Sequence, residues 1–263
     1  MDGRERLLGA FSKGRPALIP YLTAGYPSLE GAREVARAYL EAGADVLEIG
    51  VPFSDPLADG PTIQDTTARA LENGADMDYC LGLAGEFSGR APVVLLVYYN
   101  LIFARGVERF VREAAGAGVS GVVVPDLPVD EAGELARAVE KGGMAFCPLA
   151  APTSTDERLE KIGSLASGFV YCVSVAGVTG VREKLPPGAV ELLRRVRARV
   201  SAPVALGFGI GSAEAAREAA GEADGIIIGS RLMQLVGEGG PERAGEWLRG
   251  VREALSRTAG RSH

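Results

Sequence analysis

Eight short apolar runs, separated by segments of helical periodicity, constrain the fold of this chain more than any other feature. Near-continuous apolar strands are typical of a parallel sheet that helices cover on both faces. The segments between the runs, such as LEGAREVARAYLEAG, alternate charged and apolar residues at helical spacing. Eight strand–helix units in 263 residues predict one α/β domain over residues 1–263, folded as a (β/α)8 (TIM) barrel, with an open doubly wound sheet as the main alternative. The runs cover residues 17–25, 44–52, 92–100, 121–128, 144–152, 169–175, 203–210 and 223–230.

Two further helices are predicted outside the repeating units. Charged and apolar residues alternate at the N-terminus, which predicts a short amphipathic helix over about residues 3–13. The segment DMDYCLGLAGEFSGR, residues 76–90, lies between the second helix and the third apolar run. We therefore expect it to form an added helix on the outside of the barrel.

Charge and cysteine content exclude several classes of partner. The chain carries 28 lysines and arginines against 34 aspartates and glutamates, a net charge of −6, whereas nucleic acids and anionic membranes require a clustered basic face. No apolar run approaches the roughly 20 residues of a membrane span, and the N-terminus lacks a signal-peptide core. Cys80, Cys147 and Cys172 lack C-x-x-C spacing, as expected of reduced packing thiols. We expect a cytoplasmic protein that binds neither nucleic acid nor membrane.

The second apolar run contains one acid, Glu48, in the sequence DVLEIGV. Side chains alternate along a strand, so Leu47 and Ile49 share one face while Val46 and Glu48 share the other. The aliphatic face should meet the helices, which places Glu48 inside the barrel, near the strand ends where barrels carry their active sites. No run contains Lys or Arg, so a buried ion pair is the less favoured alternative and burial should raise the pKa of Glu48. Such an acid suits proton transfer in both directions.

The loop after Glu48 carries two more acids, Asp55 and Asp59, among three prolines. A loop aspartate usually forms a turn or caps a helix, and Asp59 directly precedes a predicted helix. The prolines also stiffen this loop, which favours a second hypothesis. In that hypothesis the loop holds Asp59 toward the barrel mouth as a partner of Glu48.

Glycines cluster at the ends of the seventh and eighth runs. They occur in GFGIGS, residues 207–212, and in IIIGS, which ends in Gly229 and Ser230. Barrels often bind phosphate at these two strand ends, through backbone amides and the N-terminus of a short extra helix. Residues 231–239, RLMQLVGEG, are a candidate for that helix. Amide dipoles can hold a dianion without an arginine cluster, which agrees with the acidic net charge.

Residues that are absent restrict the chemistry further. The single histidine is His263, so a histidine triad and a histidine metal site are disfavoured. The lysines fall outside the apolar runs, which disfavours a Schiff-base lysine on a strand. The long segment 174–188 is either a mobile lid or a surface loop. Tyr171, in the sixth run, is either a core aromatic or a ligand contact. The remaining chemistry is carboxylate acid–base catalysis on a phosphorylated substrate, without metal or cofactor.

Five motifs resemble those of the tryptophan synthase alpha subunit. They are LEIGVPFSDPLADGPTIQ (47–64), VYYNLIFARGVERF (97–110), PDLP (125–128), AGVTG (176–180) and GFGI (207–210). The resemblance extends from about Ile19 to the last helix. It implies a (β/α)8 barrel that acts as a lyase in tryptophan biosynthesis. The implied reaction cleaves indole-3-glycerol phosphate to indole and glyceraldehyde 3-phosphate, without a cofactor.

The resemblance also implies a role for each matching residue. Glu48 and Asp59 would be the catalytic acids and Tyr171 the active-site tyrosine beside Glu48. Asp59 would accept the indole N–H, and Thr179 would close on it when the lid orders. The implied phosphate-binding positions are Gly180, Phe208, Gly209, Gly229 and Ser230, and the implied indole pocket comprises Tyr21, Ile63, Leu96 and Val123.

Members of this family usually pair with a pyridoxal-phosphate-dependent beta subunit, so the resemblance implies an alpha2beta2 heterotetramer. Asp55, Asn100, Asp126 and Pro128 match positions that meet the beta subunit. One departure concerns Val175, where some relatives carry an arginine in the lid, so the lid-anchoring contact of that arginine is not transferred to this chain.

Two other functions remain as alternatives. One is a different phosphate-binding barrel, such as a sugar-phosphate isomerase or an indole-glycerol-phosphate synthase, although the synthase would need a catalytic lysine at a strand end. The other is a non-catalytic regulatory subunit that keeps the fold and the partner surface. Such a subunit would be expected to have lost one of the paired carboxylates, yet both Glu48 and Asp59 are present.

Overall fold

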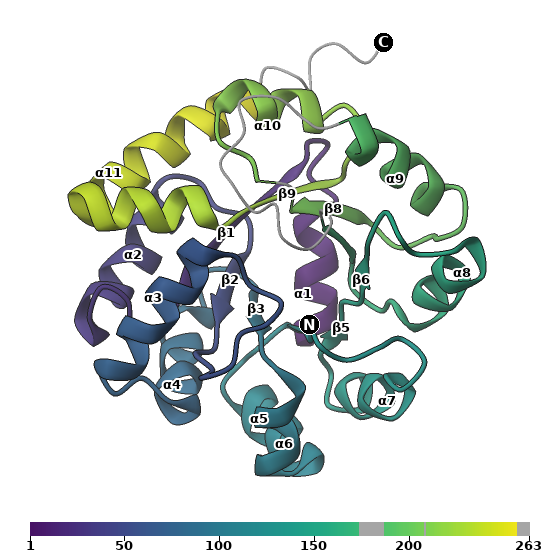
Figure 1. The fold of residues 1–263 in the computed structure, drawn as a ribbon, viewed down its shortest axis with the longest axis horizontal. Helices are drawn as coiled ribbons and strands as arrows, with labels where there is room; N and C mark the ends of the chain where they lie inside the picture. Colours follow the sequence, from purple (N-terminus) through teal and green to yellow (C-terminus); the bar gives the residue numbers. More distant parts are fainter. Residues whose placement is uncertain (174–186, 208, 257–263) are drawn as a thin grey trace.

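In the described part of the chain, nine parallel strand segments form a ring with helices around it (Figure 1). The computed structural model of the protein describes residues 1–173, 187–207 and 209–256. The strand order is β5-β4-β3-β2-β1-β9-β8-β7-β6, and all neighbouring strands are parallel. The strands are β1 (Ala17–Thr23), β2 (Leu47–Gly50), β3 (Val93–Leu96), β4 (Gly121–Val123), β5 (Ala145–Phe146), β6 (Leu149–Ala150), β7 (Val170–Val173), β8 (Val204–Gly207) and β9 (Gly225–Ile228).

The two ends of this strand order, β5 and β6, are both parts of the predicted fifth run. Strand β5 pairs with β4, and β6 pairs with β7, so residues 145–150 close the ring. Pro148 interrupts the strand because it has no N–H to donate to a ladder. The backbone switches neighbours around it: Cys147 N donates to Val122 O at 2.9 Å, whereas the carbonyl of Pro148 accepts from Tyr171 N at 2.9 Å. The predicted eight-strand barrel is therefore confirmed, with its fifth strand divided in two.

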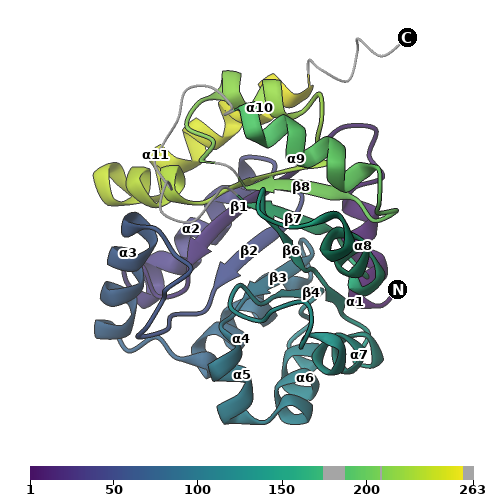
Figure 2. The ribbon, with the colours of Figure 1, turned by 45° about the vertical axis from the view of Figure 1, so that its right-hand side comes forward.

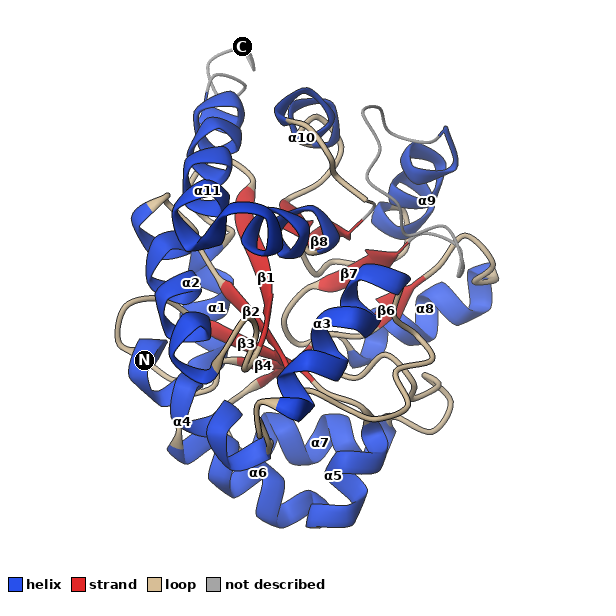
Figure 3. Ribbon diagram, turned by 60° about the vertical axis from the view of Figure 1, so that its left-hand side comes forward, coloured by secondary structure: helices blue, strands red, loops and turns tan. Residues whose placement is uncertain are grey.

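The helices other than α1 lie around the outside of the ring of strands, which is seen from two sides in Figures 2 and 3. The expected extra helix is α4, and the expected N-terminal helix is α1. One helix was not expected: α5 begins at Tyr99, inside the third apolar run. The helices are α1 (Gly3–Ala10), α2 (Leu29–Glu41), α3 (Pro61–Glu72), α4 (Met77–Ser88), α5 (Tyr99–Arg105), α6 (Val107–Gly116), α7 (Gly133–Lys141), α8 (Asp156–Leu165), α9 (Pro187–Arg197), α10 (Ala213–Ala219) and α11 (Ser230–Ser256).

Alternation along the strands produces two apolar clusters. The larger cluster packs between strands and helices and includes Leu47 and Ile49. The smaller cluster fills the barrel interior and includes Val46, Val94 and Val123. This is the arrangement that the alternation in DVLEIGV predicts. Burial of both strand faces explains why the strands read as almost continuous apolar runs.

Helix α1 covers the amino-terminal end of the barrel, and Figure 1 shows it across the middle of the ring. Its Leu7 and Ala10 belong to the interior cluster. Phe11, which follows the helix, packs on Phe169 with ring centroids 5.5 Å apart. Gly121 leaves room for this packing, because a Cβ at this position would lie 2.9 Å from the end of the Leu7 side chain and 3.2 Å from the Ala145 carbonyl oxygen. With the amino-terminal end filled, the carboxyl ends of the strands are the end at which a barrel of this kind carries an active site.

Candidate active site

Glu48 lies in β2 and its side chain points into the barrel. It is fully buried, and neither carboxylate oxygen has a hydrogen-bond partner among the residues that the structure describes. No described lysine or arginine forms a salt bridge with it. Burial, with a further contribution from the charge of Asp59, raises the pKa of Glu48 to about 8. The carboxyl group is therefore largely protonated at neutral pH and is available for proton transfer in either direction.

Asp59 lies at the end of the loop after β2, and Tyr98 is its hydrogen-bond partner. The Tyr98 hydroxyl donates to Asp59 Oδ2 at 2.9 Å. Burial raises the pKa of Asp59 to about 6, and the Tyr98 hydrogen bond acts in the opposite direction. Helix α3 has Gly60 as its N-cap and no side-chain cap hydrogen bond. The helix-capping role considered for Asp59 is therefore wrong.

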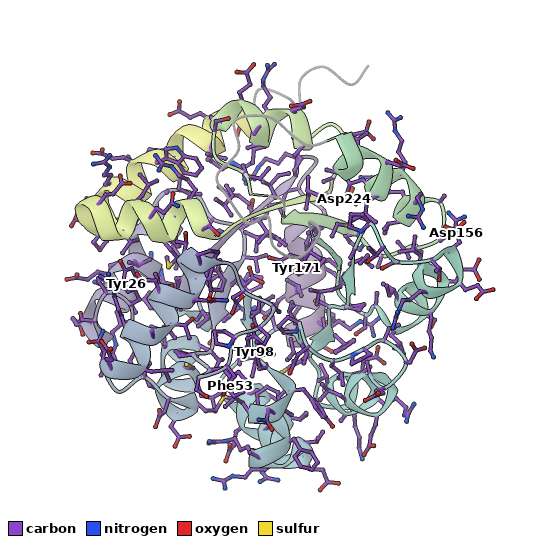
Figure 4. The ribbon with its side chains drawn as sticks, in the orientation of Figure 1. Tyr26, Phe53, Tyr98, Asp156, Tyr171 and Asp224 are labelled. Carbon is purple, nitrogen blue, oxygen red and sulfur yellow. The ribbon has the colours of Figure 1, made fainter. Side chains whose placement is uncertain are left out.

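Tyr98 was not identified as a site residue from the sequence. It follows β3 and is the N-cap residue of α5. Figure 4 shows Tyr98 next to Phe53 of the β2–α3 loop, and their ring centroids are 5.1 Å apart. The available signal was its position, since a tyrosine at the carboxyl end of a strand neighbouring β2 can reach the loop that carries Asp59.

Two further tyrosines lie beside the acids, each packed over a glycine. Tyr21 in β1 is the register partner of Glu48, and a Cβ on Gly50 would lie 2.1 Å from its hydroxyl oxygen. Tyr171 in β7 packs over Gly207 in the same way, with a Cβ there 2.5 Å from the ring. Figure 4 places Tyr171 in the centre of the ring. Glycine is needed at both positions because any side chain would displace an active-site ring.

The environment of these tyrosines keeps them protonated. Burial, followed by the nearby charge of Glu48, raises the pKa of Tyr171 well above its usual value. Burial and the charge of Asp59 do the same for Tyr21. The Tyr21 hydroxyl lies 3.3 Å from Thr23 Oγ1. The site thus combines two carboxyl groups of raised pKa with neutral phenols.

The candidate phosphate site lies at the ends of β8 and β9. Gly209 has φ +49°, in the left-handed region, and Gly229 follows directly after β9. Ser230 is the first residue of α11. This helix bends at Gly239 and Gly240, so its first part is the short helix predicted after Ser230. Its N-terminal amides and dipole are suited to an anion.

The remaining pocket positions are divided between the interior and the helix layer. Val123 is buried in the interior cluster and Leu96 packs against it. Ile63 is buried in α3, within the larger cluster. Thr179, Gly180 and Phe208, like Val175, lie outside the described residues.

All four residues expected at the partner surface are exposed: Asp55, Asn100, Asp126 and Pro128. Two apolar side chains on the same segments are exposed as well, Leu57 at 92% and Phe103 at 69%. They were not identified from the sequence, where the only signal is an apolar residue in a polar loop or at the outer face of a short helix.

The described part of the chain contains no group of three or more potential metal-ligating side chains. Its helices include none that is long and apolar enough to cross a membrane.

Comparison with known proteins identifies the family. The family model described as tryptophan synthase alpha chain matches residues 9–256. The chain belongs to the tryptophan synthase alpha chain family. The resemblance inferred from the motifs is confirmed, and membership argues against the other phosphate-binding barrels.

Individual relatives agree with this assignment. The tryptophan synthase alpha chain of Roseiflexus sp. (strain RS-1) is 46% identical over 246 residues, which cover 91% of this chain and 94% of the relative. A solved tryptophan synthase structure from Mycobacterium tuberculosis has a TM-score of 0.90 at 37% identity, covering 95% of this chain and 98% of that chain. A structure of the tryptophan synthase a2b2 complex from Pyrococcus furiosus has a TM-score of 0.85 at 40% identity, covering 92% and 98%.

Proposed function

We propose that this protein is the alpha subunit of tryptophan synthase and that Glu48 and Asp59 are its catalytic acids. The reaction is the retro-aldol cleavage of indole-3-glycerol phosphate to indole and glyceraldehyde 3-phosphate in tryptophan biosynthesis. The observation that carries the proposal is the pair of carboxyl groups at the mouth of the barrel, one without any polar partner among the described residues and both with a raised pKa. We propose that residues 1–263 act as one barrel domain in the cytoplasm.

Cleavage requires one proton to be added and one to be removed. Indole C3 gains a proton, and the hydroxyl on the carbon attached to C3 loses one. The C3–carbon bond then breaks, its electrons remain with the ring, and the hydroxyl carbon becomes the aldehyde. One carboxyl group can perform both transfers, because it is returned to its original protonation state. Glu48 suits this role because its oxygens are free of competing hydrogen bonds within the described structure and its pKa of about 8 lies near the working pH.

Asp59 supports the same step from the loop. As the indole C3 is protonated, positive charge develops on the ring nitrogen, and an ionised carboxylate that accepts the N–H stabilises it. The pKa of Asp59, about 6, leaves the group ionised at neutral pH, while Glu48 remains protonated. The two acids thus divide the roles of charge stabiliser and proton donor. Tyr171, beside Glu48, bounds the space in which the substrate would lie.

Phosphate recognition is proposed for the ends of β8 and β9 and the start of α11. Gly209, Gly229 and Ser230 would bind the phosphate through backbone amides. We extend this set to Thr179, Gly180 and Phe208 on the resemblance to the family. Tyr21, Ile63, Leu96 and Val123 would line the indole pocket. No metal or cofactor takes part in the proposed mechanism.

The proposed partner is a beta subunit in an alpha2beta2 assembly. The Pyrococcus furiosus relative forms such an a2b2 complex. The exposed Asp55, Asn100, Asp126 and Pro128, together with Leu57 and Phe103, would contact it. All of these residues lie on loops or on helix α5, in the segments that follow β2, β3 and β4, at the same end of the barrel as the proposed active site.

The decisive experiment measures indole release from indole-3-glycerol phosphate by the purified protein, with and without a beta subunit. We expect Glu48→Gln to fold and bind substrate but to lose at least about 1,000-fold in kcat, and Asp59→Asn to lose at least about 100-fold. The matched control is Glu72→Gln, the same change at an exposed position of α3, which should keep full activity. Absence of turnover by the wild-type protein in both conditions would exclude the lyase function. Substantial activity in Glu48→Gln would exclude the assigned role of Glu48.

A further inference from the structure

The Tyr98 hydroxyl makes two hydrogen bonds to adjacent residues of the loop that carries Asp59. It donates to Asp59 Oδ2 at 2.9 Å and accepts from Ala58 N at 3.1 Å. Both distances and both directions are those of ordinary hydrogen bonds. A single phenol therefore fixes the backbone of the loop and the carboxylate that projects from it.

Tyr98 is itself rigidly held. Its side chain is buried, at 3% exposure, and packs on Phe53. On one side along the chain, Val97 N donates to Val123 O at 3.0 Å, which continues the sheet ladder. On the other side, Tyr99 N donates to Asp126 Oδ1 at 2.8 Å, which fixes the start of α5. The hydroxyl thus occupies a position set by β3, β4 and the loop after β4.

Apart from the Tyr98 hydroxyl, few contacts hold the Asp59 side chain in place. The described contacts of this segment are mainly short-range, such as Asp59 N to Pro56 O at 3.0 Å. Gln64 Nε2 donates to the backbone carbonyl of Asp59 at 2.8 Å, but it does not contact the carboxylate. Tyr98 provides the only side-chain hydrogen bond to the Asp59 carboxylate within the described structure.

The other titratable groups that interact with Asp59 cannot replace this hydrogen bond. They are Tyr21 from β1, Glu48 from β2 and Tyr171 from β7, and none of them is a cation. Burial, together with the negative charge of Asp59, keeps the pKa of Tyr98 well above its usual value, so its hydroxyl remains a donor. A permanent neutral donor favours the ionised form of the carboxylate that it contacts.

We propose that Tyr98 is a positioning residue, whose hydroxyl holds the Asp59 carboxylate at the barrel mouth and favours its ionised state. The proposal rests on the function proposed above for Asp59. It predicts that the hydroxyl, and not the ring, is what the reaction requires. It also predicts that loss of the hydroxyl changes the pH dependence of catalysis and does not simply reduce the amount of active protein.

The test is Tyr98→Phe, which keeps the ring and its packing on Phe53. Because the Tyr98 hydrogen bond opposes the effect of burial, the pKa of Asp59 should rise above its wild-type value of about 6. In a plot of kcat/KM for indole-3-glycerol phosphate against pH, the rise on the acid side reports the ionisation of Asp59. In Tyr98→Phe this rise should therefore move to higher pH. We expect a loss of about tenfold to a hundredfold near pH 6, and a smaller loss near pH 8. The fall of kcat/KM on the alkaline side, which we attribute to deprotonation of Glu48, should stay at the same pH.

The matched control is Tyr39→Phe, which removes a hydroxyl that is fully buried in α2 and has no hydrogen-bond partner among the described residues. It should leave the rise on the acid side and the fall on the alkaline side unchanged. A second measurement follows the Asp59 carboxyl carbon by NMR during a pH titration, without substrate. A higher Asp59 pKa in Tyr98→Phe, but not in Tyr39→Phe, supports the proposal.

Two results would overturn the proposal. One is a Tyr98→Phe variant with wild-type kcat/KM and an unshifted rise on the acid side. The other is an equal loss of activity at every pH together with an unchanged Asp59 titration, which would mean that the hydroxyl only stabilises the fold. If the wild-type protein released no indole, the proposed function would fail separately, and the Asp59 titration would still decide the role of Tyr98.

Discussion

Asp45 and Glu48 are buried acids three positions apart, one just before β2 and one within it, and their surroundings differ completely. Asp45, 3% exposed, precedes β2 at the amino-terminal face of the barrel, and Lys13, Arg15 and Arg252 all donate to its carboxylate. Glu48, fully buried within β2, has no hydrogen-bond partner among the described residues. Among the described residues, three cations contact Asp45 and none contacts Glu48, as expected if Asp45 serves stability and Glu48 serves the proposed catalysis.

The pKa values of the Asp45 and Glu48 carboxyl groups shift in opposite directions. Burial alone would raise the pKa of Asp45, but hydrogen bonds from Arg15, Lys13 and the Leu18 amide outweigh it, and the pKa is lowered. Burial, followed by the charge of Asp59, raises the pKa of Glu48 to about 8, and no described cation or hydrogen bond opposes it. Burial by itself therefore does not identify a catalytic acid. What distinguishes Glu48 is that no described cation compensates its burial, so its pKa lies close to neutral pH, as the proposed role requires.

The largest expected effect on stability comes from removing the charge of Asp45. In Asp45→Asn, three cations would lose their common partner, and the Arg252 side chain is only 12% exposed. An unpaired buried charge is costly, so we expect the free energy of unfolding to fall by about 3–5 kcal/mol, measured by urea denaturation. Activity per folded molecule should be preserved because Asp45 lies at the other end of the barrel. A stable but inactive variant would contradict this separation of the two faces.

Local sequence pattern was enough to predict the barrel and the orientation of Glu48. Both depend on properties of single segments, namely the apolar runs, the helical spacing between them and the alternation of Leu47, Glu48 and Ile49. The split of the fifth strand and the early start of α5 at Tyr99 are smaller differences. The first follows from Pro148, which cannot donate to a ladder. In the second, the Asp126 carboxylate accepts from the Tyr99 amide.

The partners of the acids could not be predicted, because they are distant in the sequence. Tyr98 is 39 positions from Asp59, and Arg252 is 207 positions from Asp45. Which polar groups meet depends on how the strands are arranged around the ring and on the rotamers of long side chains. The sequence resemblance identified residues in known motifs, but neither Tyr98 as the partner of Asp59 nor Asp45 is marked by any local pattern.

A second prediction concerns how the stability of Glu48→Gln depends on pH. The folded-state pKa of Glu48, about 8, is above its ordinary value of 4.5. Its protonated form therefore contributes stability that is fully present below pH 4.5 and is lost as the pH rises toward 8. Glutamine does not titrate. The free energy of unfolding of the variant should therefore increase relative to that of the wild type by roughly 1.4 kcal/mol per pH unit across this interval.

The slope with pH is the quantity to measure, because the buried glutamine amide introduces a constant cost of its own. Thermal unfolding of both proteins between pH 5 and pH 8 provides the comparison. Glu72→Gln should show no such slope, since Glu72 is exposed. If the difference in stability between Glu48→Gln and the wild type stays constant with pH, Glu48 is ionised in the folded protein.

The smallest expected effects compare the cations around Asp45 with each other. Arg252 and Lys13 both contact the carboxylate, but the Arg252 side chain is 12% exposed and that of Lys13 is 47% exposed. Since an exposed ion pair loses little when broken, we expect Lys13→Met to cost less than about 0.5 kcal/mol and Arg252→Met about 1–2 kcal/mol. Arg217→Met, which breaks an exposed pair with Glu214 on α10, should cause no measurable change in urea denaturation. Equal losses for Lys13→Met and Arg252→Met would mean that the number of cations, and not their burial, determines how strongly Asp45 is compensated.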